Sequence, residues 1–91
     1  METTESLIKV LEQEGWRNLS ETPKRIIAFQ KRVDGDVDVV VEIRRESTSF
    51  LVYSSAEHRT SGPTETLEGS AVLLSDAFQL VASCCRYWDA P

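Results

Sequence analysis

The side chains with the most versatile chemistry in this sequence are one histidine and two cysteines. His58 stands between Glu57 and Arg59 in a polar stretch. A histidine acts as a general base when neighbouring groups fix its position, and a mobile stretch holds such a group poorly in place. We therefore expect His58 to be a solvated surface residue and predict no catalytic site.

Cys84 and Cys85 are adjacent in a stretch with helical periodicity. Successive side chains on a helix point about 100° apart, so these two thiols cannot easily bridge each other. Metal-binding cysteines usually occur in pairs with short spacers such as Cys-x-x-Cys, a pattern that this sequence lacks. We expect core packing for these cysteines, and we predict no metal site and no cofactor.

Carboxylates at Asp34, Asp36 and Asp38 have the alternate spacing of some calcium ligands, but the rest of a calcium loop is missing. They indicate a solvated turn. The four glycines are widely separated, so no phosphate-binding loop is predicted. None of these patterns indicates an enzyme.

Composition describes one folded domain over residues 1–91, with 41% hydrophobic and 27% charged residues. The net charge of −5 makes direct binding to nucleic acid phosphates unfavourable. Glu2 and Glu5 occupy the place where a signal peptide would be basic, and no apolar run is as long as a membrane span. We expect a cytoplasmic protein that does not enter a membrane.

The last predicted helix, Ser70 to Trp88, organises the chain because two apolar stripes run along it. The first stripe contains Ala71, Leu74, Phe78, Val81, Cys85 and Trp88, and the second contains Leu73, Ala77, Leu80, Cys84 and Tyr87. A helix that is apolar over half its surface needs two partners. One is a sheet, and the other is the first helix, a second copy or another protein.

A first helix should begin at Thr3 or Thr4 and end at Gly15, with Trp16 packing back on it. Residues 16–19 are a short strand or an extended connection. Residues 26–33 and 37–44 are rich in β-branched side chains and predict a hairpin. A three-residue loop, Val33 to Gly35, pairs Arg32 with Asp36 and gathers the apolar side chains on one face, with Lys31 as the one charged exception.

A further strand is predicted at Phe50 to Ser54, where both faces are apolar and periodicity cannot choose the inner one. Residues 55–69 are expected to form a long, polar, mobile loop. The predicted fold is α+β: a two-layer sandwich in which N- and C-terminal helices cover one face of an antiparallel sheet of three or four strands. The helix, three strands, helix order also occurs in double-stranded-RNA-binding domains, but the basic residues of their second helix are missing from Gly69 to Asp76.

We therefore predict a non-enzymatic protein-binding module: an adaptor, chaperone-like factor or regulator that forms a homodimer through the last helix or the open sheet face. The predicted contact residues are Leu73, Leu80, Cys84, Tyr87 and Trp88 on the helix and Val40, Leu51 and Tyr53 on the sheet. The alternative is an acidic inhibitor or immunity-type protein that covers a basic site on its partner, using Glu12, Glu14 and Glu21.

Overall fold

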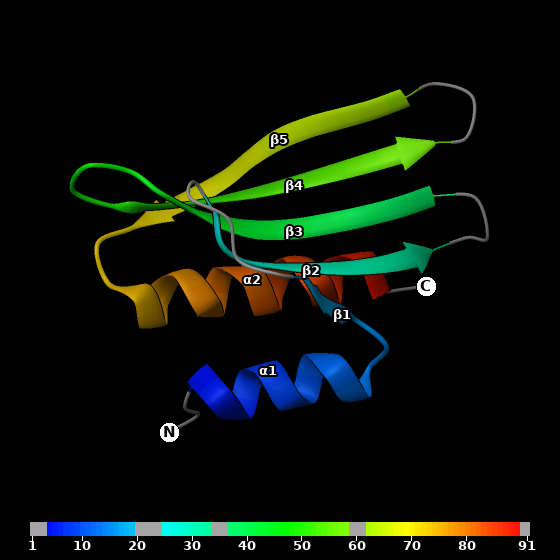
Figure 1. Cartoon of the computed structure of the whole chain (residues 1–91), viewed down its shortest axis with the longest axis horizontal. Helices are drawn as coiled ribbons and strands as arrows, with labels where there is room; N and C mark the ends of the chain where they lie inside the picture. The colour runs from blue at the N-terminus through cyan, green and yellow to red at the C-terminus, as the bar shows by residue number, and fades with distance from the viewer. Residues whose placement is uncertain (1–3, 20–24, 34–36, 59–61, 90–91) are drawn as a thin grey trace.

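The computed structural model describes residues 4–19, 25–33, 37–58 and 62–89. Within these ranges the elements are, in chain order, α1 (Thr4–Gln13), β1 (Arg17–Leu19), β2 (Arg25–Val33), β3 (Val37–Arg45), β4 (Phe50–His58), β5 (Gly62–Ala71) and α2 (Leu74–Asp89). The strands form one antiparallel sheet in the order β1-β2-β3-β4-β5. Figure 1 shows both helices on the same side of this sheet. The predicted α+β class is confirmed, with five strands instead of three or four.

The β2–β3 hairpin has the predicted faces but a different register. Phe29, Val39, Val41 and Ile43 are fully buried beneath the helices. The structure pairs Arg32 with Asp38, two positions from the predicted partner. A shift of two residues leaves every side chain on the same face, because side chains in a strand alternate with a period of two. The predicted bulge at Gly35 lies outside the described residues.

The prediction of a loop over residues 55–69 is wrong. Ser55–His58 continues β4, and most of the remaining residues belong to β5, which pairs with β4 from His58 and Gly62 to Phe50 and Ala71. β5 is an edge strand whose residues from Thr64 to Glu68 are exposed, so it shows no alternation of apolar and polar residues. Glu68 is an extra residue between the pairs of Tyr53 with Leu67 and Val52 with Gly69, and forms a bulge.

The last helix is shorter than predicted. β5 continues to Ala71, and α2 begins at Leu74 instead of Ser70. α2 packs against β3, β4 and β5 and also against α1. Its fully buried side chains are Ala77, Phe78, Val81, Ala82 and Cys85. The first predicted stripe is therefore the core stripe over Phe78, Val81 and Cys85, whereas Ala71 belongs to the sheet.

The end of α1 follows the prediction. Gly15 has a φ of 100°, and the backbone N–H groups of Gly15 and Trp16 donate to the carbonyl oxygens of Glu12 and Leu11. This is the Schellman arrangement that glycine favours because it has no Cβ. Trp16 then packs into the core with 1% of its surface exposed. Residues 17–19 form β1, which pairs with β2, so the open question about this segment is answered in favour of a strand.

Lys31 is the charged residue on the apolar face of the hairpin, and it connects three elements. Its Nζ donates to the carbonyl oxygen of Glu14 at 2.7 Å and to Oδ1 of Asp89 at 2.5 Å. The Trp16 indole Nε1 donates to Oδ2 of the same carboxylate at 3.0 Å. A cation at the C-terminal end of α1 also suits the helix dipole. Lys31 thus ties β2 to the C-terminal ends of both helices.

Candidate protein-binding surface

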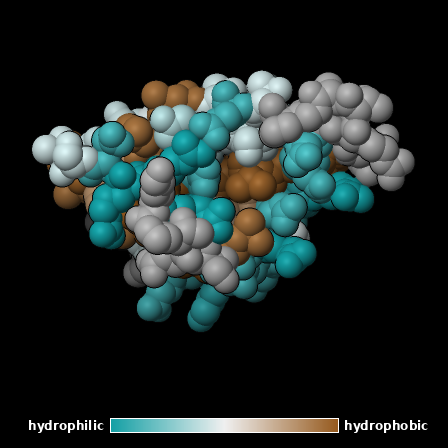
Figure 2. Space-filling view, turned by 45° about the horizontal axis from the view of Figure 1, so that its top comes forward, coloured by the Kyte–Doolittle hydropathy of each residue, from teal (hydrophilic) through white to brown (hydrophobic). Residues whose placement is uncertain are grey.

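Large exposed apolar side chains are concentrated in one part of the chain. Within the described residues, these side chains are Leu67, Val72, Leu73, Leu74 and Tyr87. All come from β5, from the turn after it or from α2. Figure 2 shows that, on the face displayed, apolar groups form separate patches divided by hydrophilic side chains. The large exposed apolar side chains therefore lie along β5, the turn after it and α2.

The predicted helix contacts divide into two groups. Leu73 and Tyr87 are strongly exposed, at 60% and 74% of their surface, and lie at opposite ends of α2, with Leu73 in the turn before it. Leu80, Cys84 and Trp88 are half-buried and pack against the core. In the second predicted stripe, Ala77 is fully buried, Leu80 and Cys84 are partly covered, and Leu73 and Tyr87 at the two ends are exposed.

The predicted sheet contacts lie on the other face. Val40, Leu51 and Tyr53 alternate with buried Val39, Val41 and Val52, so they point away from the helices. This settles which side of β4 is inner. The structure therefore separates the two groups of predicted contact residues and does not bring them into one site.

Ion pairs cover the open sheet face around Tyr53. The Arg44 guanidinium lies 4.1 Å from the centroid of the Tyr53 ring and bonds with Glu42 and Glu65 at 2.6 Å each. The hydrogen bond from Arg44 is the main cause that lowers the pKa of Glu65, and Glu65 in turn raises the pKa of Arg44. Arg32 pairs with Asp38 in the same way and lowers the pKa of that carboxyl. Polar groups thus occupy much of the predicted sheet patch.

Two hollows lie between α2 and the edge strand β5. The first encloses about 360 Å³ and is lined by Ser70, Ala71, Asp76, Gln79, Leu80 and Ser83. The second encloses about 230 Å³ and is lined by Glu68, Ser83, Cys84, Tyr87 and Trp88. Ser83 lines both, so the two hollows are neighbours along α2; we call them together the β5–α2 groove. Small side chains in the strand and the helix leave this space open.

Side chains at the ends of the groove are fixed by local contacts. The Tyr87 and Trp88 rings meet edge to face, with centroids 5.7 Å apart. Ser54 Oγ donates to Glu68 Oε1 at 2.5 Å, which directs the carboxylate of the bulge residue under the sheet. A Cβ at Gly69 would lie 3.2 Å from Leu80 Cδ1, so glycine allows the leucine to pack closely on β5. The groove is therefore a largely preformed feature.

The thiols are unsuited to nucleophilic chemistry. Burial, with a smaller contribution from Glu68, raises the pKa of Cys84 from 9.0 to about 11. Burial also raises the pKa of Cys85. A thiol with a raised pKa is protonated at neutral pH, and the thiolate is the reactive form. The described residues contain no group of three or more metal-ligating side chains, and the side chain of His58 lies outside the described part.

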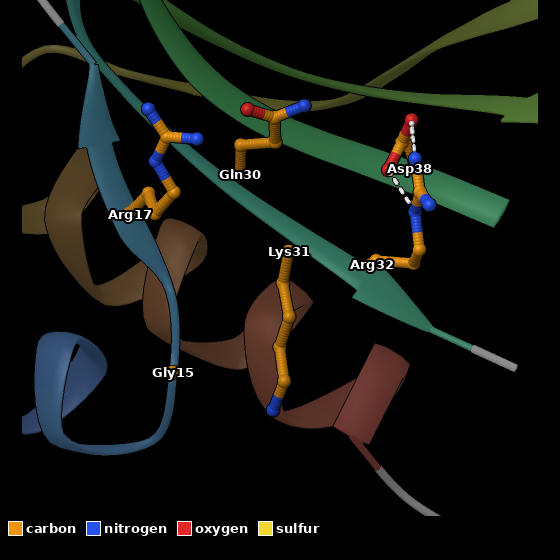
Figure 3. A pocket seen from close by; sticks show the side chains of 6 residues that line it. All are labelled: Gly15, Arg17, Gln30, Lys31, Arg32 and Asp38. Carbon is orange, nitrogen blue, oxygen red and sulfur yellow. Dashed lines mark hydrogen bonds and ion pairs between the residues drawn. The ribbon is translucent and has the colours of Figure 1, made fainter. Parts of the chain in front are cut away.

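A third hollow has a basic lining. It encloses about 270 Å³ near Gly15, with Arg17, Lys31 and Arg32 around it. Figure 3 shows Arg32 turned to Asp38, and Lys31 directed away from Arg17 and Gln30, toward the end of α2. Because acidic groups of the chain pair with Lys31 and Arg32, this hollow is a poor candidate for an anion site.

Comparisons with protein-family models, curated proteins and solved structures find no match to this chain. None of the described helices is long and apolar enough to cross a membrane. The predicted contacts include the groove residues Leu80, Cys84, Tyr87 and Trp88 and miss Glu68, Ser70, Ala71, Asp76, Gln79 and Ser83. Asp76 and Ser83 could have been found from the row Asp76, Leu80, Ser83 and Tyr87, whose spacing places these side chains along one side of a helix. No pattern in the sequence marks Glu68 and Ser70.

Proposed function

We propose that this protein is a non-enzymatic protein-binding module, an adaptor, chaperone-like factor or regulator, that uses the β5 and α2 side of the molecule. The observation that supports this most is the location of the exposed large apolar side chains, all of which come from residues 67–87 within the described part. Exposed apolar groups beside a preformed hollow are typical of interaction sites.

Self-association is part of this proposal. A homodimer through α2 would cover Leu73 and Tyr87, the side chains at its two ends. The open sheet face is a weaker candidate because Arg44, Glu42 and Glu65 would have to be desolvated there. We place the protein in the cytoplasm, since both free thiols suit a reducing compartment.

The test measures binding by the full chain and by two matched double variants. Leu73→Asp with Tyr87→Asp adds charge at the two exposed ends of α2, whereas Gln13→Asp with Asn18→Asp adds the same charge at exposed positions on α1 and β1. Light scattering over a range of concentrations reports self-association, and chemical cross-linking in extracts reports other partners. We expect association that the first pair abolishes and the control pair preserves. Absence of any association, or equal loss in both pairs, would contradict the proposal.

The alternative function is an acidic inhibitor or immunity-type protein. Glu12 and Glu14 are exposed at the end of α1, while Glu21 lies outside the described residues. An inhibitor held by these charges should lose affinity when salt rises from about 0.1 M to about 1 M, which shortens the Debye length from about 10 Å to about 3 Å. Neutralising Glu12 and Glu14 should then weaken binding, whereas a partner held on the β5 and α2 side should be indifferent to that change.

A further inference from the structure

We infer that the β5–α2 groove binds a segment of another protein in which apolar side chains are flanked by lysine or arginine. This inference rests on the proposed function and specifies where the partner binds and what chemistry it presents.

The groove has the dimensions of a peptide site. Asp76, Leu80, Ser83 and Tyr87 follow one side of α2, and Tyr87 comes eleven positions after Asp76. At 1.5 Å per residue this side is about 16 Å long. An extended segment of about five residues spans the same length. Leu80, Cys84 and Trp88 give the groove an apolar, half-buried wall.

The charge of the groove selects the partner. Glu68 and Asp76 are the charged side chains among its lining residues, and the described lining contains no lysine or arginine. The chain as a whole carries a net charge of −5. A partner segment with basic residues beside its apolar ones would therefore be attracted to the groove and held in a defined register.

The same charge argues against a second copy in this groove, so a homodimer that covers Leu73 and Tyr87 would have to keep the acidic lining of the two copies apart. In a two-fold dimer the same surface meets itself, so Glu68 and Asp76 of one copy would approach the acidic groups of the other. Like charges placed opposite each other destabilise an interface. The bulge at Glu68 also protects the edge of β5 against direct strand pairing.

The probe is a random library of twelve-residue peptides displayed on phage and selected against the immobilised full chain. Selected peptides are synthesised with a fluorescent label, and their Kd is measured by fluorescence polarisation. Two groove variants are compared with two controls. Ser83→Trp fills the groove and is matched by Gln13→Trp on α1; Glu68→Gln with Asp76→Asn removes two charges and is matched by Glu12→Gln with Glu14→Gln.

We expect peptides in which lysine or arginine flanks apolar residues. Each groove variant should weaken binding about tenfold or more, because losing a central contact commonly has an effect of that size, and each control should stay within about twofold of the wild type. Ser83 is exposed, so Ser83→Trp should fold, and urea unfolding of every variant verifies this. The charge variant keeps the shape of both side chains and supplies a second, independent readout.

Other results overturn the inference in distinguishable ways. Peptides whose affinity ignores the groove variants would refute the site and leave the proposed function standing. A homodimer lost in Ser83→Trp, with no peptide selected, would assign the groove to a second copy. If no peptide is selected and the wild type also fails the association test of the proposed function, both proposals fall.

Discussion

Replacing Lys31 with methionine should measure how much the contacts of Lys31, which join the two helices to the sheet, contribute to the free energy of unfolding. Methionine is also long and unbranched, but it cannot donate to the Glu14 carbonyl or pair with Asp89. A hydrogen bond to a charged group contributes about 1.5–3 kcal/mol, whereas an exposed ion pair contributes about 0.2–1 kcal/mol. The Lys31 and Asp89 side chains are 26% and 25% exposed, so their interaction falls between these two cases.

From these magnitudes we expect Lys31→Met to lower the free energy of unfolding by about 2 kcal/mol. Asp89→Asn should cost about 1 kcal/mol, because an amide oxygen can still accept the hydrogen bond from the Trp16 indole. The double variant should lose less than the sum of the two, with a coupling energy of about 1 kcal/mol.

The assay is urea unfolding followed by far-UV circular dichroism, which does not depend on the surroundings of Trp16. Arg32→Met is the matched control: Arg32 is the next residue on β2, its side chain is 61% exposed, and it pairs with Asp38. It should cost less than about 1 kcal/mol. The reasoning is refuted if the Lys31 and Asp89 effects add within about 0.3 kcal/mol, or if the control costs as much as Lys31→Met.

Two further predictions concern α2. Phe78 is 3% exposed and lies at the centre of the buried face of this helix. Phe78→Ala should therefore lower the free energy of unfolding by about 3–5 kcal/mol. A loss below about 1 kcal/mol in urea unfolding would show that the core is misassigned. The pKa of Cys84 is raised from 9.0 to about 11, chiefly by burial, so the unfolded chain loses this proton at lower pH than the folded one. Stability should therefore be intact below pH 9 and decline between about pH 9 and pH 11, and Cys84→Ala should decline less; an identical pH profile for wild type and variant would contradict the assignment.

The β2–β3 hairpin could be predicted because the alternation of its side chains shows which face of each strand is buried. Val37, Val39, Val41 and Ile43 alternate on β3 with residues that are polar apart from Val40, and only pairings that keep this alternation bury all four. The sequence does not distinguish registers that differ by two residues, because both keep the faces. The observed pairing places Arg32 opposite Asp38, with which it forms an ion pair. The predicted pairing would have placed Arg32 opposite another aspartate, Asp36, so charge does not distinguish the two registers.

β5 could not be predicted, for a physical reason. Thr64, Glu65, Thr66 and Glu68 have no apolar periodicity, because this strand lies at the edge of the sheet and most of its side chains remain exposed. Its existence depends on pairing with β4, a tertiary contact that no local pattern encodes. The missed strand also explains why the groove was missed, since residues 55–69 were predicted as a loop and the sheet under the last helix therefore lacked its edge strand.

The role of Lys31 could not be predicted from the sequence either. From the sequence it was a charged residue that disturbed an apolar face. Its partners, the Glu14 carbonyl and the Asp89 carboxylate, are set by where two helices end in space.

The antiparallel sheet and the contacts of Asp89 with Trp16 and Lys31 differ in how far apart in the sequence their partners lie. Each strand pairs with the next along the sequence, so the sheet assembles by closing short loops, at small entropic cost. The hydrogen bond from Trp16 to Asp89 spans 73 positions, and the ion pair of Lys31 with Asp89 spans 58. These bonds connect the end of α1 and strand β2 to the last turn of α2, and most of the polypeptide lies between the connected positions. Loosening either end therefore loosens the other, and α1 and the last turn of α2 should open together as one unit while the sheet stays paired.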